Sequence, residues 1–211
     1  MFFLTLFIVC FGMCAGKKEA LFKAEVLNNE QLFRRSLKMV RGGDNLHLFM
    51  FSVQMTKNIS KCLVSQFLKR TKDGAIRTLE TNNIVESKEM ETNSNFPDIK
   101  TNVTINVRKD DSSPPYFDVT FQPALPFAAW MERQNVIHAK PEQCLLLGSP
   151  SNGKWSRLCT LWGPKKCQNN PKCWLNCQMT FVEKCRTGVP VNLTQCAETN
   201  LEKGGSYHGP K

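Results

Sequence analysis

Residues 101–108 read TNVTINVR and residues 116–122 read YFDVTFQ, and in both stretches apolar and polar side chains alternate. Successive side chains of a β-strand point to opposite faces, so this alternation is typical of strands with one buried face. The apolar positions are Val103, Ile105 and Val107 in the first stretch, and Phe117, Val119 and Phe121 in the second. The two stretches are therefore predicted to be strands whose apolar side chains point into the protein.

Further short strand-like runs are separated by turn-forming residues. They are Asn45–Met55, Lys61–Lys69, Ala75–Thr81, Ile84–Glu91, Phe127–Ala139 and Gln143–Gly148. Eight strands with hairpin-length connections suit an up-and-down barrel or a sandwich. Because a sandwich normally brings long crossovers and none is visible, the sequence favours an eight-stranded antiparallel barrel, an all-β fold with added helices.

Helical patterns flank this β-rich region. Residues 17–41 contain no Pro or Gly and repeat apolar residues at helical spacing up to Gly42, which predicts one or two N-terminal helices. Pro171–Lys184 is predicted to form a C-terminal helix, with Asn170 as its N-cap and Pro171 at its first position. Cys173 and Cys177 are four residues apart, so they lie on one face of that helix and are expected to tether it to the barrel.

The first sixteen residues predict export. They carry no charged side chain, and the apolar run 2–11 is followed by small residues and then by Lys17 and Lys18. This is the pattern of a signal peptide cleaved after Gly16, and the run is too short to span a bilayer. A buried N-terminal element is the alternative interpretation. The expected division is a signal peptide at 1–16, one domain at 17–200 and a flexible tail at 201–211, in a secreted, extracellular protein.

Eight cysteines follow the predicted cleavage point, which indicates a disulfide framework in an oxidising compartment. They are Cys62, Cys144, Cys159, Cys167, Cys173, Cys177, Cys185 and Cys196. Cys62 alone lies outside the last third of the chain, so we expect it to pair within that third. No Cys-x-x-Cys pair occurs, and no metal site is predicted. Asn58, Asn102 and Asn192 each begin a glycosylation sequon.

The net charge of +10 is spread along the chain without a long Lys/Arg block. This distribution argues against a nucleic-acid partner, and solubility explains it most simply. Heparin-like polysaccharide, anionic membranes and acidic ligands stay open as alternatives. No nucleophile elbow, phosphate loop or zinc-protease motif occurs, and the three histidines, His47, His138 and His208, have no accompanying motif. The sequence predicts neither an enzyme nor a bound cofactor.

The last third resembles the tick salivary lipocalins, the family of the histamine-binding proteins. The resemblance rests on residues 144–147 (CLLL), 158–162 (LCTLW) and 171–177 (PKCWLNC), continued by Phe181, Cys185 and Cys196, and on residues 61–64 (KCLV). It implies that the strand at Cys144 is the last of the barrel, that the Cys-x-Leu-Trp element follows it, and that a disulfide-tethered helix comes next. It also implies that Cys62 pairs near the C-terminus. Cys167 is additional to the family pattern.

The resemblance implies a monomeric barrel that sequesters a small host mediator. Amine-binding members carry Asp after the first cysteine and Glu before Leu-Trp, whereas this chain has Leu145 and Thr160 there. We therefore expect a fatty-acid-like or leukotriene-like lipid. A biogenic amine (histamine or serotonin), or a protein-binding inhibitor with no small ligand, are the alternatives. The expected ligand-binding residues are Phe49, Phe51, Val103, Ile105, Phe117, Val119, Phe121 and Trp130.

Overall fold

The computed structural model describes residues 25–57, 59–81, 100–111, 113–123, 131–150 and 158–196. The expected signal peptide at 1–16, the expected strand at 84–91, the tail at 201–211, Asn58 and Trp130 lie outside these residues.

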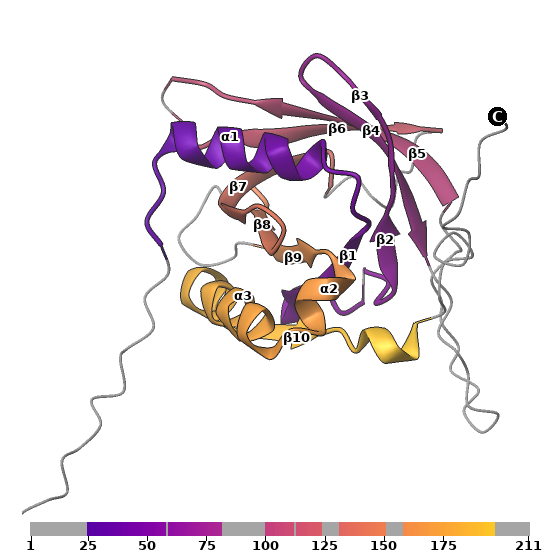
Figure 1. Ribbon diagram of the computed structural model, residues 1–211, viewed down its shortest axis with the longest axis vertical. Helices are drawn as coiled ribbons and strands as arrows, with labels where there is room; N and C mark the ends of the chain where they lie inside the picture. The colour runs from indigo at the N-terminus through magenta and orange to yellow at the C-terminus, as the bar shows by residue number, and fades with distance from the viewer. Residues whose placement is uncertain are drawn as a thin grey trace, which may run out of the picture.

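Eight strand positions form a closed barrel (Figure 1). The strands are β1 (Leu46–Ser52), β2 (Leu63–Ser65), β3 (Phe67–Arg70), β4 (Gly74–Thr81), β5 (Lys100–Arg108), β6 (Tyr116–Gln122), β7 (Arg133–Lys140), β8 (Cys144–Gly148) and β9 (Cys159–Gly163). β2 and β3 are separated only by Gln66 and both pair with β4, so together they fill one position. All pairings are antiparallel, and β9 pairs with β1 to close the sheet. The eight-stranded antiparallel barrel predicted from the sequence is confirmed.

The closing strand differs from the sequence expectation. The strand at Cys144, here β8, was expected to be the last of the barrel, but β9 follows it and pairs with both β8 and β1. The opposite edge of β1 is shared by two partners: β2 pairs at Leu46 and His47, and β10 (Gly188–Pro190) pairs at Met50–Ser52. Both edges of β1 are thus paired, as buried backbone N–H and C=O groups require.

Helix α1 (Asn29–Val40) covers the end of the barrel where β1 begins (Figure 1). Asn28 and Gln31 form a reciprocal capping box at its start, which satisfies two otherwise unpaired backbone N–H groups. Leu32, Ser36, Met39 and Val40 form its buried face. The helix predicted within residues 17–41 is confirmed for 29–40, and α1 seals this end of the barrel.

A C-terminal unit lies on the outside of the barrel. It contains α2 (Lys165–Gln168), α3 (Pro171–Cys185), β10 and a short 3-10 turn, η3 (Leu193–Gln195); a second such turn, η1 (Val53–Met55), follows β1. Asn170 caps α3 as predicted, since its side chain accepts hydrogen bonds from the Lys172 and Cys173 backbone N–H groups at 3.1 Å each. The predicted C-terminal helix is therefore confirmed.

Four disulfides fasten this unit, and they use every cysteine of the described residues. Cys144–Cys177 and Cys159–Cys185 join α3 to β8 and β9, Cys167–Cys173 joins α2 to α3, and Cys62–Cys196 joins the β1–β2 connection to the end of the unit. Cys62 thus pairs within the last third of the chain.

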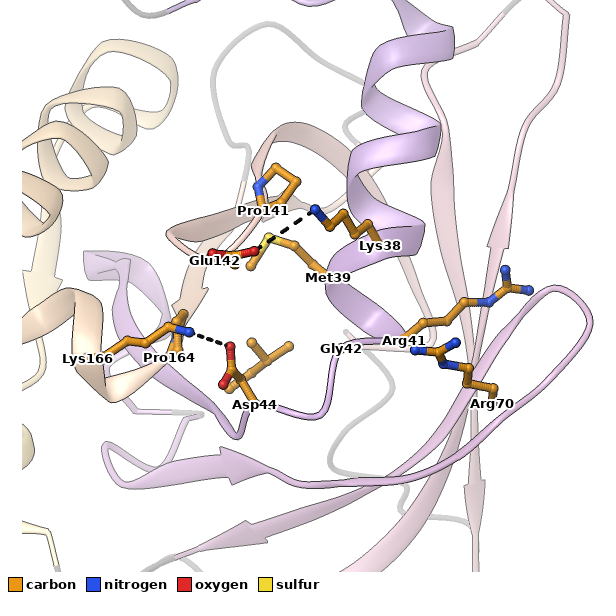
Figure 2. A pocket seen from close by; sticks show the side chains of 11 residues that line it. Lys38, Met39, Arg41, Gly42, Asp44, Arg70, Pro141, Glu142, Pro164 and Lys166 are labelled. Atoms are coloured by element: carbon orange, nitrogen blue, oxygen red, sulfur yellow. Dashed lines mark hydrogen bonds and ion pairs between the residues drawn. The ribbon is translucent and has the colours of Figure 1, made fainter.

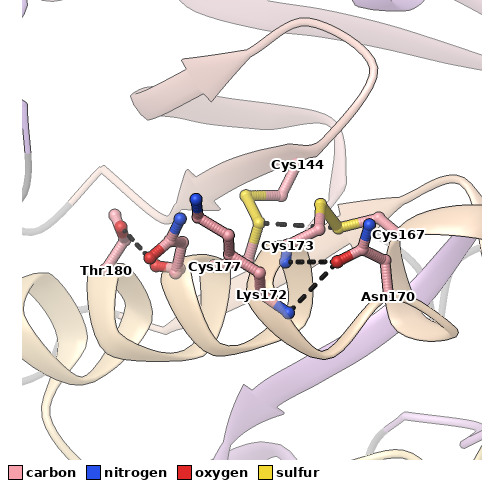
Figure 3. Close-up of a disulfide and its surroundings, with 8 residues drawn as sticks. Cys144, Cys167, Asn170, Lys172, Cys173, Cys177 and Thr180 are labelled. Atoms are coloured by element: carbon pink, nitrogen blue, oxygen red, sulfur yellow. Dashed lines mark hydrogen bonds between the residues drawn. A yellow bond between two sulfur atoms is a disulfide. The ribbon is translucent and has the colours of Figure 1, made fainter.

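Two of these disulfides lie against each other. The sulfurs of Cys167, Cys173 and Cys177 lie within 4.8 Å of one another, with Cys167 and Cys177 Sγ 3.9 Å apart (Figure 3). Each sulfur is already bonded in a disulfide, so the cluster offers no thiolate to a metal ion.

Within the described part of the chain, no helix has the length and apolar character needed to cross a bilayer.

Candidate functional site

The barrel encloses a cavity of about 50 Å³ on its axis. Its lining comes from α1 and from all eight strand positions of the barrel or their ends: Val40, Leu46, Ser65, Leu79, Val103, Ile105, Phe117, Val119, Met131, Gln134, Leu145, Leu147 and Trp162. None of these side chains carries a formal charge. We call this space the axial cavity.

Regular pairing aims the predicted residues of β5 and β6 at the axial cavity. Ile105 lies opposite Val119, and Val107 lies opposite Phe117, so these side chains share one face. Val103, Ile105, Phe117 and Val119 all line the cavity. Phe121 lies opposite Val103 and is buried on the same face, but it does not line the cavity itself.

A bulge in β1 separates the two predicted phenylalanines of that strand. The register between β1 and β9 shifts between Leu48 and Met50, which makes Phe49 the extra residue. Phe49 packs outside the barrel against Trp174 of α3, with ring centroids 5.6 Å apart in an edge-to-face arrangement. It does not line the axial cavity. Phe51 lies opposite Thr160, on the inner face, yet it too lies outside the lining.

Two polar groups on the inner face of β9 were not among the predicted site residues. Trp162 lines the cavity, and its Nε1 is buried without a hydrogen-bond partner in the described part of the protein. The hydroxyl of Thr160, one inner position along β9, is likewise buried and unpaired there. Leu145 lies opposite Trp162 and also lines the cavity. The positions where amine-binding lipocalins carry acids therefore hold uncharged side chains on the inner face.

Arg77 is fully buried on the inner face of β4, opposite Val103 of β5. Its five N–H donors all reach protein acceptors at 2.7–3.0 Å: the Ser65 hydroxyl and carbonyl, and the carbonyls of Val40, Gly42 and Asp44. Burial lowers the pKa of Arg77 to about 10, so the guanidinium stays charged at neutral pH. Arg77 thus fastens the end of α1 to the barrel and leaves a positive charge inside it.

A surface hollow of about 580 Å³ lies outside the barrel at the end covered by α1 (Figure 2). We call it the basic cleft; its charged lining residues are Lys38, Arg41, Asp44, Arg70, Glu142 and Lys166. Ion pairs join Lys166 to Asp44 at 2.9 Å and Lys38 to Glu142 at 4.0 Å. These pairs neutralise about half of its positive charge.

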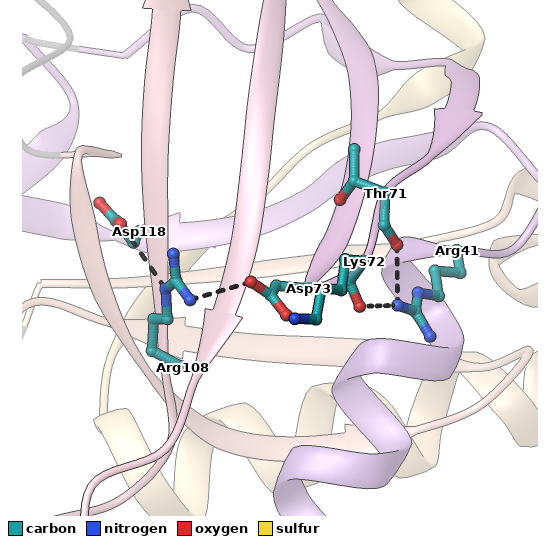
Figure 4. Close-up of polar contacts among 6 residues, drawn as sticks. All are labelled: Arg41, Thr71, Lys72, Asp73, Arg108 and Asp118. Carbon is teal, nitrogen blue, oxygen red and sulfur yellow. Dashed lines mark hydrogen bonds and ion pairs between the residues drawn. The ribbon is translucent and has the colours of Figure 1, made fainter.

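Hydrogen bonds and an ion pair also hold the neighbouring β3–β4 turn (Figure 4). Arg41 donates to the carbonyls of Thr71 and Lys72, while Asp73 pairs with Arg108 at 3.1 Å. The main role of Arg41 is therefore to connect the end of α1 to this turn.

A smaller hollow of about 170 Å³ lies between β7, β8 and α3. His138 lines it and is 4 % exposed; burial is the main reason that its pKa lies below the ordinary value, and Arg35, Lys140 and Lys184 add to the effect while Glu25 opposes it. Glu25 and Lys140 also line this hollow, and charged side chains of this kind do not suit an apolar ligand.

Two predicted glycosylation sites lie among the described residues. Asn102 is exposed on the outer face of β5, and Asn192 is exposed just before η3, where its side chain accepts a hydrogen bond from the Thr194 hydroxyl at 2.7 Å. Both positions leave room for a glycan, which stays a prediction.

No family model matches the chain, and no curated protein is significantly similar in sequence. Solved structures do match in fold. Japanin from Rhipicephalus appendiculatus bound to cholesterol has a TM-score of 0.50 and 19% identity over 72% of this chain and 94% of that chain. Apocrustacyanin C1 has a TM-score of 0.52 and 10% identity over 86% of this chain and 93% of that chain. At these identities the likeness shows a shared fold, the one expected from the resemblance.

Proposed function

Given a barrel with the lipocalin fold, we propose that this protein is a secreted, non-enzymatic carrier that sequesters a small hydrophobic or amphipathic mediator in its axial cavity. The observation that carries the proposal is the cavity lining, which is apolar apart from three uncharged polar residues and is contributed by strands around the whole barrel. An eight-stranded barrel interior either is filled by side chains or holds one small ligand. Japanin, a structure of the same fold, is bound to cholesterol.

The charges of the interior argue against an amine ligand. A buried ammonium needs a carboxylate or several acceptors, and no acidic side chain among the described residues lines the cavity. The Arg77 guanidinium lies on the same inner face and repels a cation. Histamine and serotonin are therefore poorer candidates than a neutral or acidic lipid.

The present cavity is smaller than a bound lipid. Ligand pockets usually measure about 300–1,000 Å³, whereas the axial cavity measures about 50 Å³. Binding of a lipid thus requires lining side chains to move apart. Met131 is suited to this movement because its side chain is unbranched and has three rotatable bonds.

A matched pair of substitutions on β6 tests the proposal. Val119 points into the axial cavity and Thr120, its neighbour, is exposed on the outer face. Val119→Trp should fill the cavity and abolish binding of a neutral fluorescent probe, N-phenyl-1-naphthylamine, while Thr120→Trp should bind it as the wild type does. Equal binding by all three proteins would place the probe elsewhere and refute the proposal. Near-ultraviolet circular dichroism checks that each variant is folded.

A further inference from the structure

We infer that the ligand carries a neutral hydrogen-bond acceptor, an alcohol or carbonyl oxygen, which binds the indole N–H of Trp162. This inference rests on the proposed function, because it assigns the head group of the molecule held in the same cavity.

Trp162 lines an apolar space and carries an unused hydrogen-bond donor. The side chain is 5 % exposed, its ring lines the axial cavity, and Nε1 has no acceptor among the described residues. The indole nitrogen can only donate, so its partner has to be an acceptor. Buried polar groups are nearly always paired in native proteins, and an unpaired donor on a cavity wall therefore calls for a partner within the cavity.

The protein offers Trp162 no acceptor from the neighbouring strands. The residues directly opposite it are Leu48 on β1 and Leu145 on β8, both buried and apolar. Trp174 serves as a comparison, because it lies outside the barrel against Phe49 and is partly exposed. Among the described residues, tryptophan thus occurs once on the cavity wall and once on the outer surface.

A second uncharged polar group shares the lining. Gln134 of β7 is 3 % exposed and lines the same cavity. A carboxamide both donates and accepts, so it suits a hydroxyl or a carbonyl equally. The few polar groups of the cavity lining are therefore all uncharged, and the rest of the lining is apolar.

The arrangement disfavours a charged head group of either sign. A buried carboxylate needs a cationic partner with free donors, but all five Arg77 donors are engaged by protein oxygens. An ammonium meets no acidic residue in the described lining. A neutral oxygen is the head group that Trp162 can satisfy without leaving a buried charge unpaired.

Four probes with one dodecyl chain separate these head groups: 1-dodecanol, dodecane, dodecanoate and dodecylammonium. Each competes with N-phenyl-1-naphthylamine for the full secreted protein. We expect 1-dodecanol to bind about tenfold more tightly than dodecane, the equivalent of one hydrogen bond, and more tightly than either ion. Tighter binding of either ion than of the alcohol would overturn the inference.

The matched tryptophan variants then test the donor itself. Trp162→Phe keeps an aromatic ring but loses the N–H, and should remove the tenfold preference for the alcohol over the alkane; Trp174→Phe should leave that preference unchanged. An unchanged preference in Trp162→Phe would refute the role of the N–H. In the wild type, the indole N–H proton resonance of Trp162 should shift with 1-dodecanol more than with dodecane, which tests the contact without any variant.

Different experimental results would refute the proposed function and this inference. If neither the naphthylamine nor any dodecyl compound binds the wild type, the carrier function itself is wrong. If all four bind with equal affinity, the carrier function stands and the assigned head group is wrong.

Discussion

The Cys62–Cys196 disulfide should stabilise the protein far more than Cys167–Cys173, because the two bonds close loops of very different length. Their sequence separations are 134 and 6 residues. The loss of loop-closure entropy in the unfolded chain grows with the logarithm of that separation, which gives about 5 kcal/mol for the long loop and about 2 kcal/mol for the short one. Replacing both cysteines of each pair by alanine measures the difference.

The two pairs are well matched, since each joins one buried and one partly buried cysteine. Cavity effects of the alanines should therefore be similar in both variants. Thermal unfolding followed by circular dichroism should show a decrease in Tm of about 10–20 °C for the Cys62/Cys196 variant and of about 4–8 °C for the Cys167/Cys173 variant. Equal decreases would show that loop closure is not the source of the stabilisation.

Three further predictions concern single side chains. Arg77→Met should lower the free energy of unfolding by about 3–5 kcal/mol in urea titrations, because it leaves buried carbonyls unpaired; a loss below about 1 kcal/mol would contradict this. Lowering the pH from about 7.5 to about 5.5 should destabilise the wild type more than the His138→Gln variant. Burial lowers the pKa of His138 below 6.5 in the folded protein, so the unfolded chain binds the proton more readily. Identical dependence of stability on pH in the two proteins would show that His138 is not the group responsible. Gly163→Ala should cost about 1–3 kcal/mol, since a methyl group there would lie 2.5 Å from the Phe49 ring, whereas Gly43→Ala has open space and should change stability little; equal effects in chemical denaturation would refute this contact.

Alternation predicted the inner face correctly where pairing is regular. In β5 and β6 the register runs without a shift from Asn102 to Arg108, so the period of two read from the sequence holds throughout. In β1 every residue is buried, so the sequence contains no alternation to follow. The bulge there shifts the alternation, so that Phe51 lies on the inner face while Phe49 lies outside, and a bulge has no reliable signal in such an apolar strand.

The polar features of the interior were harder to predict. Arg77 lies between Ala75 and Leu79 on the inner face, yet a charged residue in a strand pattern is ordinarily assigned to solvent. Its burial depends on carbonyls at the end of α1, which no local pattern encodes. Trp162 was recognised only as part of a motif, because its place on the cavity wall follows from β9 closing the barrel.

The pairing of β1 on both edges constrains how the protein can fold while it is being synthesised. β1 begins at Leu46, but its partners on the two edges include β9, which begins at Cys159, and β10, which begins at Gly188. More than a hundred residues must therefore be synthesised before the first strand is paired on both sides, and such distant contacts slow folding. A nascent chain that stops before Cys159 would expose an almost wholly apolar strand, so we expect truncated products to aggregate. The barrel can thus close only after β9 has left the ribosome.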